Sequence, residues 1–135
     1  MNAVNQHVID MQTVHAWCMD MSNTIKHSNF NEHKQLVSER LRIYGMPNNE
    51  VVSFKEWCKR RKFELSNGLL LSVNYQYIKL TSSTGKRLRF NANETILGND
   101  GKIVILEKSF ILELEDDNAW RVIEEKVNSW RVKNS

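Results

Sequence analysis

Apolar residues recur every three or four positions in the first part of the chain, over residues 4–28. They form one stripe, made of Val4, Val8, Met11, Val14, Cys18, Met21 and Ile25. Because this spacing puts them on one face of a helix, it predicts a long amphipathic helix. Asn29 and Glu32 form a capping pair, which predicts a second short helix through "FNEHKQLVS". The alternation in "RLRIYG" then predicts a short strand that ends at Gly45.

A third helix has the clearest start signal in the sequence, "VSFKEWCKRRKFEL". Ser53 and Glu56 form a capping box, and Val52 can pack on Trp57 as a hydrophobic staple. The Asn-Gly dipeptide at 67–68 predicts the end of this helix.

From Leu69 onward the apolar pattern has a period of two, which is typical of half-buried strands. The predicted strands are 69–82, 86–97, 103–115 and 120–132. Their connections, "STG", "GNDG" and "DDNA", are short enough for hairpins. In particular, "ELEDDNAWRVIEEKV" predicts two strands joined by a charged turn at Asp116–Ala119. Helices followed by an antiparallel meander predict an α+β fold.

Composition indicates an ordinary globular protein. The 135 residues predict a single domain, 1–135, with 41% hydrophobic and 26% charged residues. A net charge of +3 is too small to indicate a nucleic-acid partner. The basic stretch "KRRK" does not indicate one either, because four consecutive basic residues spread around a helix and form a solvated face. No stretch is long enough to span a bilayer, and the N-terminus does not resemble a secretory signal. We therefore expect a cytoplasmic protein, with Cys18 and Cys58 as reduced, buried thiols.

Three segments carry a resemblance to a known family: "NFNEHKQLVSERLRIYG", "SFKEWCKRRKFE" and "ILELEDDNAWRVIEEKV". Their order and pattern resemble the nuclear transport factor 2-like superfamily, and within it the SnoaL-like branch of small bacterial proteins. The resemblance covers about residues 8–130. It implies a cone-shaped, cystatin-like fold, in which N-terminal helices pack on a strongly curved, mainly antiparallel sheet. A cavity between the sheet and the helices would be the expected place for a small ligand.

Steroid isomerases of this superfamily use a carboxylate base at the end of the first strand. A tyrosine and a protonated carboxylic acid stabilise the oxyanion on the opposite wall. The position that matches the base is Tyr44, and the position that matches the acid is Leu112. Glu113 follows directly, but a shift of one residue turns the side chain to the other face of the strand. The resemblance therefore does not extend to the isomerase carboxylates.

A dehydratase or cyclase would need other groups for proton transfer. The candidates are His15, Asp10, Asp20, Tyr44 and His33. His15 lies beside Met11 and Cys18 on the apolar stripe, which favours a buried, hydrogen-bonded histidine over a catalytic one. If it faces the cavity instead, it is the best proton-transfer group, with Asp20 or Tyr44 beside it. His33 lies on a short polar helix and is expected to be exposed to solvent.

Neither a metal nor a cofactor is indicated by the sequence. His15 and Cys18 are three residues apart, but two ligands do not make a zinc site. The stretch "STGKR" lacks the spacing of a phosphate-binding loop. Aromatic residues are instead the expected lining of a small apolar pocket. The predicted ligand-binding residues are Trp17, Tyr44, Trp57, Tyr75, Phe90 and Trp120.

These patterns favour a protein that binds a small apolar or amphipathic molecule, with no established catalysis. The first alternative is a cofactor-free dehydratase, isomerase or cyclase that works by general acid-base chemistry in the same pocket. The second is a protein-interaction module that uses the sheet face. Ile103, Ile105 and Ile111 would lie together on the outer face, which predicts a homodimer through the sheet, as the resemblance also implies.

Overall fold

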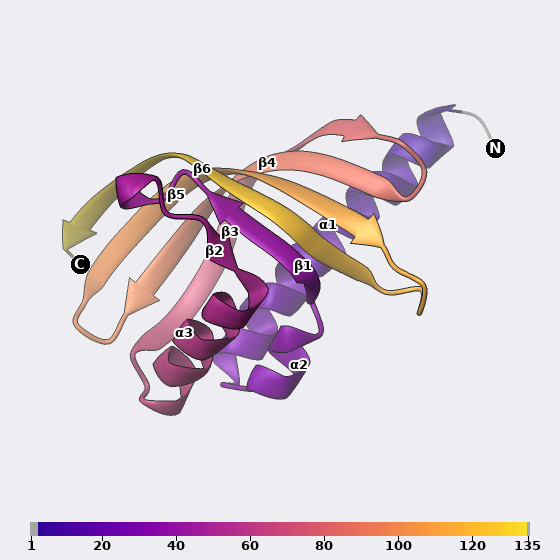
Figure 1. The fold of residues 1–135 in the computed structure, drawn as a ribbon. Helices are drawn as coiled ribbons and strands as arrows, with labels where there is room; N and C mark the ends of the chain where they lie inside the picture. Colours follow the sequence, from indigo (N-terminus) through magenta and orange to yellow (C-terminus); the bar gives the residue numbers. More distant parts are fainter. Residues whose placement is uncertain (1–2, 135) are drawn as a thin grey trace.

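A curved six-stranded sheet dominates the computed structural model, which describes residues 3–134 (Figure 1). The helices are α1 (Ala3–Lys26), α2 (Phe30–Lys34) and α3 (Phe54–Ser66), and a short 3-10 turn, η1 (Pro47–Asn49), precedes α3. The strands are β1 (Val37–Tyr44), β2 (Val52–Ser53), β3 (Leu70–Ser83), β4 (Arg87–Gly98), β5 (Lys102–Leu114) and β6 (Trp120–Asn134). The helices lie beneath the arch of the sheet, which confirms the predicted α+β cone.

The strands are arranged in the order β2-β1-β6-β5-β4-β3. β3 to β6 form the predicted antiparallel meander, whereas β1 runs parallel to β6. The charged turn after β5 is also as predicted. The amide of Glu115 donates to the carbonyl oxygen of Ala119 at 3.0 Å, and Leu114 pairs with Trp120.

The segment between α2 and β1 differs from the prediction. The second helix ends at Lys34 instead of continuing through "FNEHKQLVS", and β1 starts at Val37. The amide of Val122 donates to the carbonyl oxygen of Leu36 at 3.1 Å, and Ser38 is buried. Pairing with β6 therefore draws this segment into the sheet and overrides its local helix preference. The capping signals themselves hold, because Glu32 N donates to Asn29 Oδ1 at 3.1 Å.

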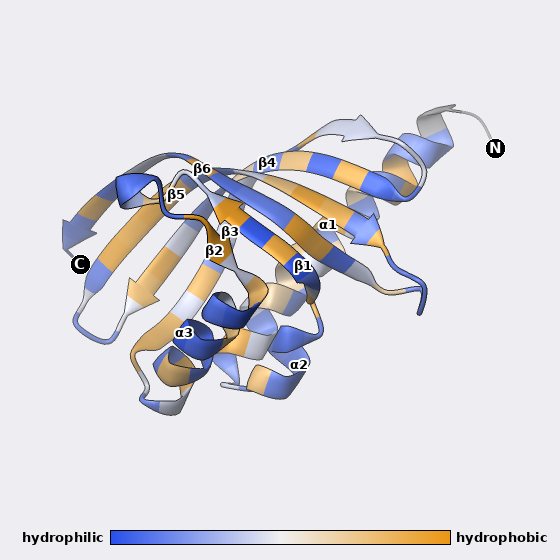
Figure 2. Ribbon diagram, viewed as in Figure 1, coloured by the Kyte–Doolittle hydropathy of each residue, from blue (hydrophilic) through white to orange (hydrophobic). Residues whose placement is uncertain are grey.

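The apolar core lies between the concave face of the sheet and α1. Hydrophobic and hydrophilic residues alternate along the strands in Figure 2, so that one face of each strand is apolar. Phe90 and Phe110 stack at the centre with 4.7 Å between ring centroids, and Trp17 packs edge-on against both rings. Trp17 Nε1 also donates to the carbonyl oxygen of Leu36 at 3.0 Å, which ties α1 to the start of β1.

Two bulges in β6 decide which of its side chains face the inside of the cone. Leu112 pairs with Val122 but Ile111 pairs with Glu124, so Ile123 is an extra residue. Lys108 pairs with Val127 but Glu107 pairs with Ser129, so Asn128 is a second one. Each bulge reverses the alternation of the strand and increases its twist. The inward-facing positions of β6 are therefore Val122, Glu125, Val127, Trp130 and Val132.

Gly45, directly after β1, allows the chain to pass close to β6. Its φ is +82°, and a Cβ at this position would lie 2.2 Å from the carbonyl oxygen of Val127.

Gly45→Ala should lower the free energy of unfolding by more than about 2 kcal/mol, since left-handed backbone strain and a backbone clash add together. Gly85→Ala is a matched control, with φ +73° and no atom within 4 Å. It should cost only about 1–2 kcal/mol in urea denaturation. Equal losses in the two variants would contradict this account.

Candidate functional site

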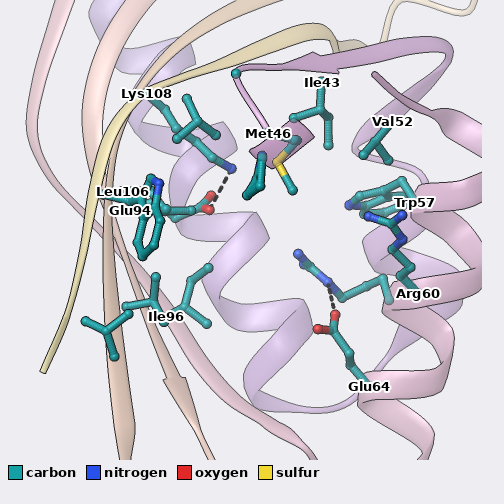
Figure 3. Close-up of a pocket in the computed structure, with 17 residues that line it drawn as sticks. Ile43, Met46, Val52, Trp57, Arg60, Glu64, Glu94, Ile96, Leu106 and Lys108 are labelled. Carbon is teal, nitrogen blue, oxygen red and sulfur yellow. Dashed lines mark hydrogen bonds and ion pairs between the residues drawn. The ribbon is translucent and has the colours of Figure 1, made fainter. Parts of the chain in front are cut away.

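A cavity of about 440 Å³ opens between α3, the loop after β1 and the inner faces of β4, β5 and β6 (Figure 3). In the close-up, Glu94, Leu106 and Lys108 lie on the sheet side, opposite Trp57, Arg60 and Glu64 on α3. Apolar lining comes from Ile43, Met46, Pro47, Val52, Trp57, Ile96, Val104, Leu106, Val127, Trp130 and Val132. The charged lining residues are Arg60, Arg61, Glu64, Glu94 and Lys108. An apolar cavity with a few converging polar groups is typical of a small-molecule site.

A buried ion triad forms the polar part of the sheet wall. The ammonium group of Lys108 on β5 lies 2.8 Å from Glu94 Oε1 on β4 and 2.7 Å from Glu125 Oε1 on β6. The side chains of all three are less than a tenth exposed. Burying these charges costs solvation, and only close pairing with good hydrogen-bond geometry offsets it.

The triad favours the charged forms of Lys108 and Glu94. Burial alone would lower the pKa of Lys108, but the charges of Glu125 and Glu94 outweigh it and raise that pKa above its ordinary value. Burial likewise opposes ionisation of Glu94. The charge and hydrogen bond of Lys108, together with the charge of Arg61, nevertheless keep the pKa of Glu94 below its ordinary 4.5. The sheet wall thus carries the Glu94 carboxylate and the Lys108 ammonium group at neutral pH.

Arg61 on α3 is the charged group held most firmly on the helix wall. Its Nε donates to Glu64 Oε1 at 3.1 Å, and its Nη1 lies 2.8 Å from His33 Nε2. The guanidinium also lies over the ring of Trp57, 5.6 Å from its centroid. These contacts fix the position of the guanidinium and leave Nη2 as a further donor.

His33 is buried, which corrects the expectation that it is exposed to solvent. Its Nδ1 lies 2.9 Å from Thr24 Oγ1, and its ring lies 5.4 Å from that of Trp57. Burial, and then the charge of Arg61, lower its pKa from 6.5 to about 3. The ring is therefore neutral, with Nδ1 donating to Thr24 and Nε2 accepting from Arg61. The polar sequence of α2 hid this role, because the helix is short and lies against α1 and α3.

Tyr75 on β3 and Cys18 on α1 lie close to Glu94 of the triad. The Tyr75 hydroxyl is buried near Glu94, but it forms no hydrogen bond of normal geometry with any residue that the structure describes. Burial, with the charges of Glu94 and Glu125, raises the pKa of Tyr75 well above 10. Burial also raises the pKa of Cys18 to about 12, so its thiol is unreactive. Cys18 and Cys58 are both free, the first buried and the second half-buried.

The predicted ligand-binding residues are spread over several parts of the molecule. Trp57 lines the main cavity, whereas Trp17 and Phe90 are buried in the core. Trp120 is half-buried and packs against that core. Tyr44, at the end of β1, has 38% of its surface exposed and is not among the lining residues of the cavity.

The predicted catalytic candidates do not come together. His15 is exposed, not buried as its place on the apolar stripe indicated, and it borders a shallow depression that also includes Cys18 and Tyr75. Asp20 is exposed near a different depression, between α1 and α2. Asp10 is buried and accepts hydrogen bonds from Gln6 Nε2 and Ser83 Oγ, at 2.8 and 2.6 Å. It therefore links α1 to β3.

Sequence reasoning missed the charged residues of the cavity, although part of the signal was present. Lys108 has the same alternation as Leu106 and Phe110, and Glu94 has the same alternation as Ala92 and Ile96. A charged residue at an inward position of a strand indicates a paired or functional group. No such signal existed for Glu125, because the bulge at Ile123 brings it to the inner face.

Residues 3–134 contain neither a metal-binding group nor a membrane-spanning helix. No group of three or more His, Cys, Asp or Glu side chains there is arranged to hold a metal ion. No helix of this part of the chain has the length and apolar character needed to cross a membrane.

Comparison with known proteins places the fold. No protein-family model and no curated protein matches the sequence. One similar solved structure is a protein from Novosphingobium aromaticivorans that is provisionally assigned as a scytalone dehydratase. Its TM-score is 0.72 and its sequence identity is 11%, and the match covers 98% of this chain and 91% of the other. A nuclear transport factor 2-like protein from Cytophaga hutchinsonii has a TM-score of 0.64 and 14% identity, and all of each chain is covered. A provisionally assigned ketosteroid isomerase from Shewanella frigidimarina has a TM-score of 0.62 and 13% identity over 88% and 94% of the chains.

The chain has the nuclear transport factor 2-like fold. This confirms the fold that the resemblance implies. At these levels of identity, the likeness concerns the fold alone.

The neutral state of His33 should make stability depend on pH. The unfolded chain binds a proton at this residue below about pH 6.5, whereas the folded chain does so only near pH 3. Stability should therefore fall as pH is lowered from 6.5, by up to about 1.4 kcal/mol per pH unit. Urea denaturation between pH 6.5 and 5 avoids the carboxylates, whose ordinary pKa is 4.5. His33→Gln should flatten the slope in this window and leave the slope above pH 7.5 unchanged. An equally steep fall in the variant would disprove the assignment.

Proposed function

We propose that this protein binds a small amphipathic molecule in the cavity between α3 and the sheet. The observation that carries the proposal is the composition of the cavity wall. Apolar side chains line most of it, and fixed, buried charges on Lys108 and Glu94 meet Arg61 across it. Such a wall can hold the apolar body of a ligand and orient its polar end.

The mouth of the cavity supports the same proposal. Trp130 and Val132 on β6 both line the cavity and expose half or more of their surface. On the opposite side, Arg60 forms ion pairs with Glu50 and Glu56 at the surface. An apolar surface that leads into a cavity and is bordered by charged groups favours entry of an amphipathic molecule from solvent.

A matched pair of substitutions on β4 tests the pocket. Ile96 lines the cavity, whereas its neighbour Thr95 points to the outer face. Native mass spectrometry of the purified protein with a panel of apolar and amphipathic metabolites should show at least one retained ligand. Ile96→Trp fills the cavity and should weaken that ligand by about tenfold or more, since displaced contacts cost over 1.4 kcal/mol. Thr95→Trp should leave its affinity within about twofold. If no panel member binds, or both variants bind equally, the cavity is not a ligand site.

A cofactor-free dehydratase, isomerase or cyclase is the second candidate. It is supported by an ionised carboxylate, that of Glu94, at the wall of the cavity, where a base could reach a bound substrate. The predicted groups His15, Asp20 and Tyr44 are not lining residues of this cavity. Turnover of a retained ligand, slowed about a hundredfold or more by Glu94→Gln with affinity kept, would favour the enzyme.

A second copy of the chain is the partner that the outer face of the sheet supports best. Ile103, Ile105 and Ile111 alternate with the cavity-facing residues of β5 and so share this face. Ile103 and Ile105 remain half-exposed in the single chain. Apolar residues grouped on an otherwise polar sheet face are typical of association surfaces.

Sedimentation at micromolar concentration tests the dimer. The expected mass is twice the 15.9 kDa of one chain. Ile105→Lys places a charge at the centre of the proposed contact and should shift the equilibrium to the monomer by about tenfold or more. Lys62→Glu, at an exposed position of α3 on the concave side of the sheet, is the control and should leave the mass unchanged. A monomer in the parent protein would exclude a homodimer, and a different partner on this face would then remain as the interaction-module alternative.

A further inference from the structure

The most deeply buried charges around the cavity lie on its two opposite walls. On the sheet wall, Glu94 and Glu125 share a single ammonium group, that of Lys108, which leaves one negative charge in excess. On the helix wall, Arg61 supplies a positive charge, and its charge contributes to keeping Glu94 ionised. The remaining charged lining groups, Arg60 and Glu64, are 49% and 43% exposed, so solvent screens them.

The Arg61 guanidinium is the least mobile partner that the sheet wall could have. Only 15% of this side chain is exposed, compared with 49% for its neighbour Arg60. The neutral ring of His33 accepts one of its hydrogen bonds without adding a second charge. The positive charge of Arg61 is therefore fixed in place, and its direct counter-charge on the helix wall is the Glu64 carboxylate, which is 43% exposed.

Each wall also offers a hydrogen-bonding group that is complementary to the other. Lys108 uses Oε1 of Glu94, and the Tyr75 hydroxyl lies near the same carboxylate, whose two oxygens keep further acceptor capacity. His33 and Glu64 use Nη1 and Nε of Arg61, which leaves Nη2 as a donor. A bound group between the two walls therefore meets an acceptor on one side and a donor on the other.

We propose that the cavity selects an uncharged amphipathic molecule whose polar end carries both a hydrogen-bond donor and an acceptor, as in a carboxamide, a lactam or a phenol. This inference rests on the proposed function and specifies its ligand class. The donor faces Glu94, the acceptor faces Arg61, and the apolar body lies against Trp57, Leu106 and Val127. A ligand with a net charge would upset the balance between Glu94 and Arg61, in a site where unpaired charge is poorly solvated.

Four probes of nearly equal size test the selectivity by isothermal titration calorimetry at pH 7.5. They are naphthamide, naphthoate, naphthylmethylammonium and acetonaphthone, with the same ring position substituted. Naphthamide should bind at least about tenfold more tightly than naphthoate or naphthylmethylammonium, because charged ends lack compensation. Acetonaphthone offers only an acceptor and should bind more weakly than naphthamide, because Glu94 is left without a donor.

Two substitutions should reverse the preference in opposite directions. Glu94→Gln removes one negative charge but leaves Lys108 paired with Glu125, so naphthoate should gain about tenfold relative to naphthamide. Arg61→Gln removes the opposing positive charge, so naphthylmethylammonium should gain by a similar factor. Lys62→Gln, at an exposed position of α3 that does not line the cavity, should keep the order of the parent protein. Circular dichroism confirms that each variant is folded, and His33→Gln replaces Arg61→Gln if that variant does not fold. Loss of the fixed guanidinium contact should then weaken naphthamide and acetonaphthone by similar factors, because both accept a hydrogen bond from Arg61.

The outcomes separate this inference from the proposal on which it rests. The selectivity is overturned if the charged probes bind as tightly as naphthamide or more tightly, and if Glu94→Gln does not change the order of affinities. The pocket itself then remains supported, because the probes bind. Absence of binding by all four probes and by the metabolite panel overturns both. Opposite shifts in Glu94→Gln and Arg61→Gln establish charge balance as the basis of selection.

Discussion

The ammonium group of Lys108, buried in the middle of the sheet, is the feature on which the inner wall of the cone depends. A single buried cation of this kind requires carboxylates from both neighbouring strands, and β4 and β6 supply Glu94 and Glu125. Because removing one partner of a buried ion pair typically costs about 3–5 kcal/mol, this interaction also fixes how the strands align. The triad therefore ties the register of β4, β5 and β6 to the polarity of the cavity.

The helices contribute to the cavity in a way that complements this wall. α3 presents Trp57 and Arg61 toward the sheet, and buried His33 of α2 holds the guanidinium from behind. A neutral histidine serves this role because it accepts a hydrogen bond without repelling the arginine strongly. The three helices thus pack on the sheet and also set the charge of the space that they leave open.

The same arrangement explains why the fold alone does not name the chemistry. Structural neighbours include proteins provisionally assigned as a dehydratase and as an isomerase. The positions that the sequence resemblance matches to the isomerase carboxylates nevertheless hold Tyr44 and Leu112. Charge here is concentrated at Glu94, Lys108 and Arg61 instead. Function in such a scaffold follows from side chains placed in the cavity, not from the scaffold that places them.

The sequence by itself determined the order and type of the elements. Periods of 3.6 and 2, the capping signals at Asn29 and Ser53 and the short turns are local features, and local physics decides them. The alternation of apolar residues in β5 also indicated that Lys108 faces inward. Only the tertiary structure decided that Glu125 faces inward, since this depends on a bulge in β6 that arises from pairing with β5. It also decided that His33, on a polar helix, is buried against Thr24 and Arg61, because residues distant in sequence close over it.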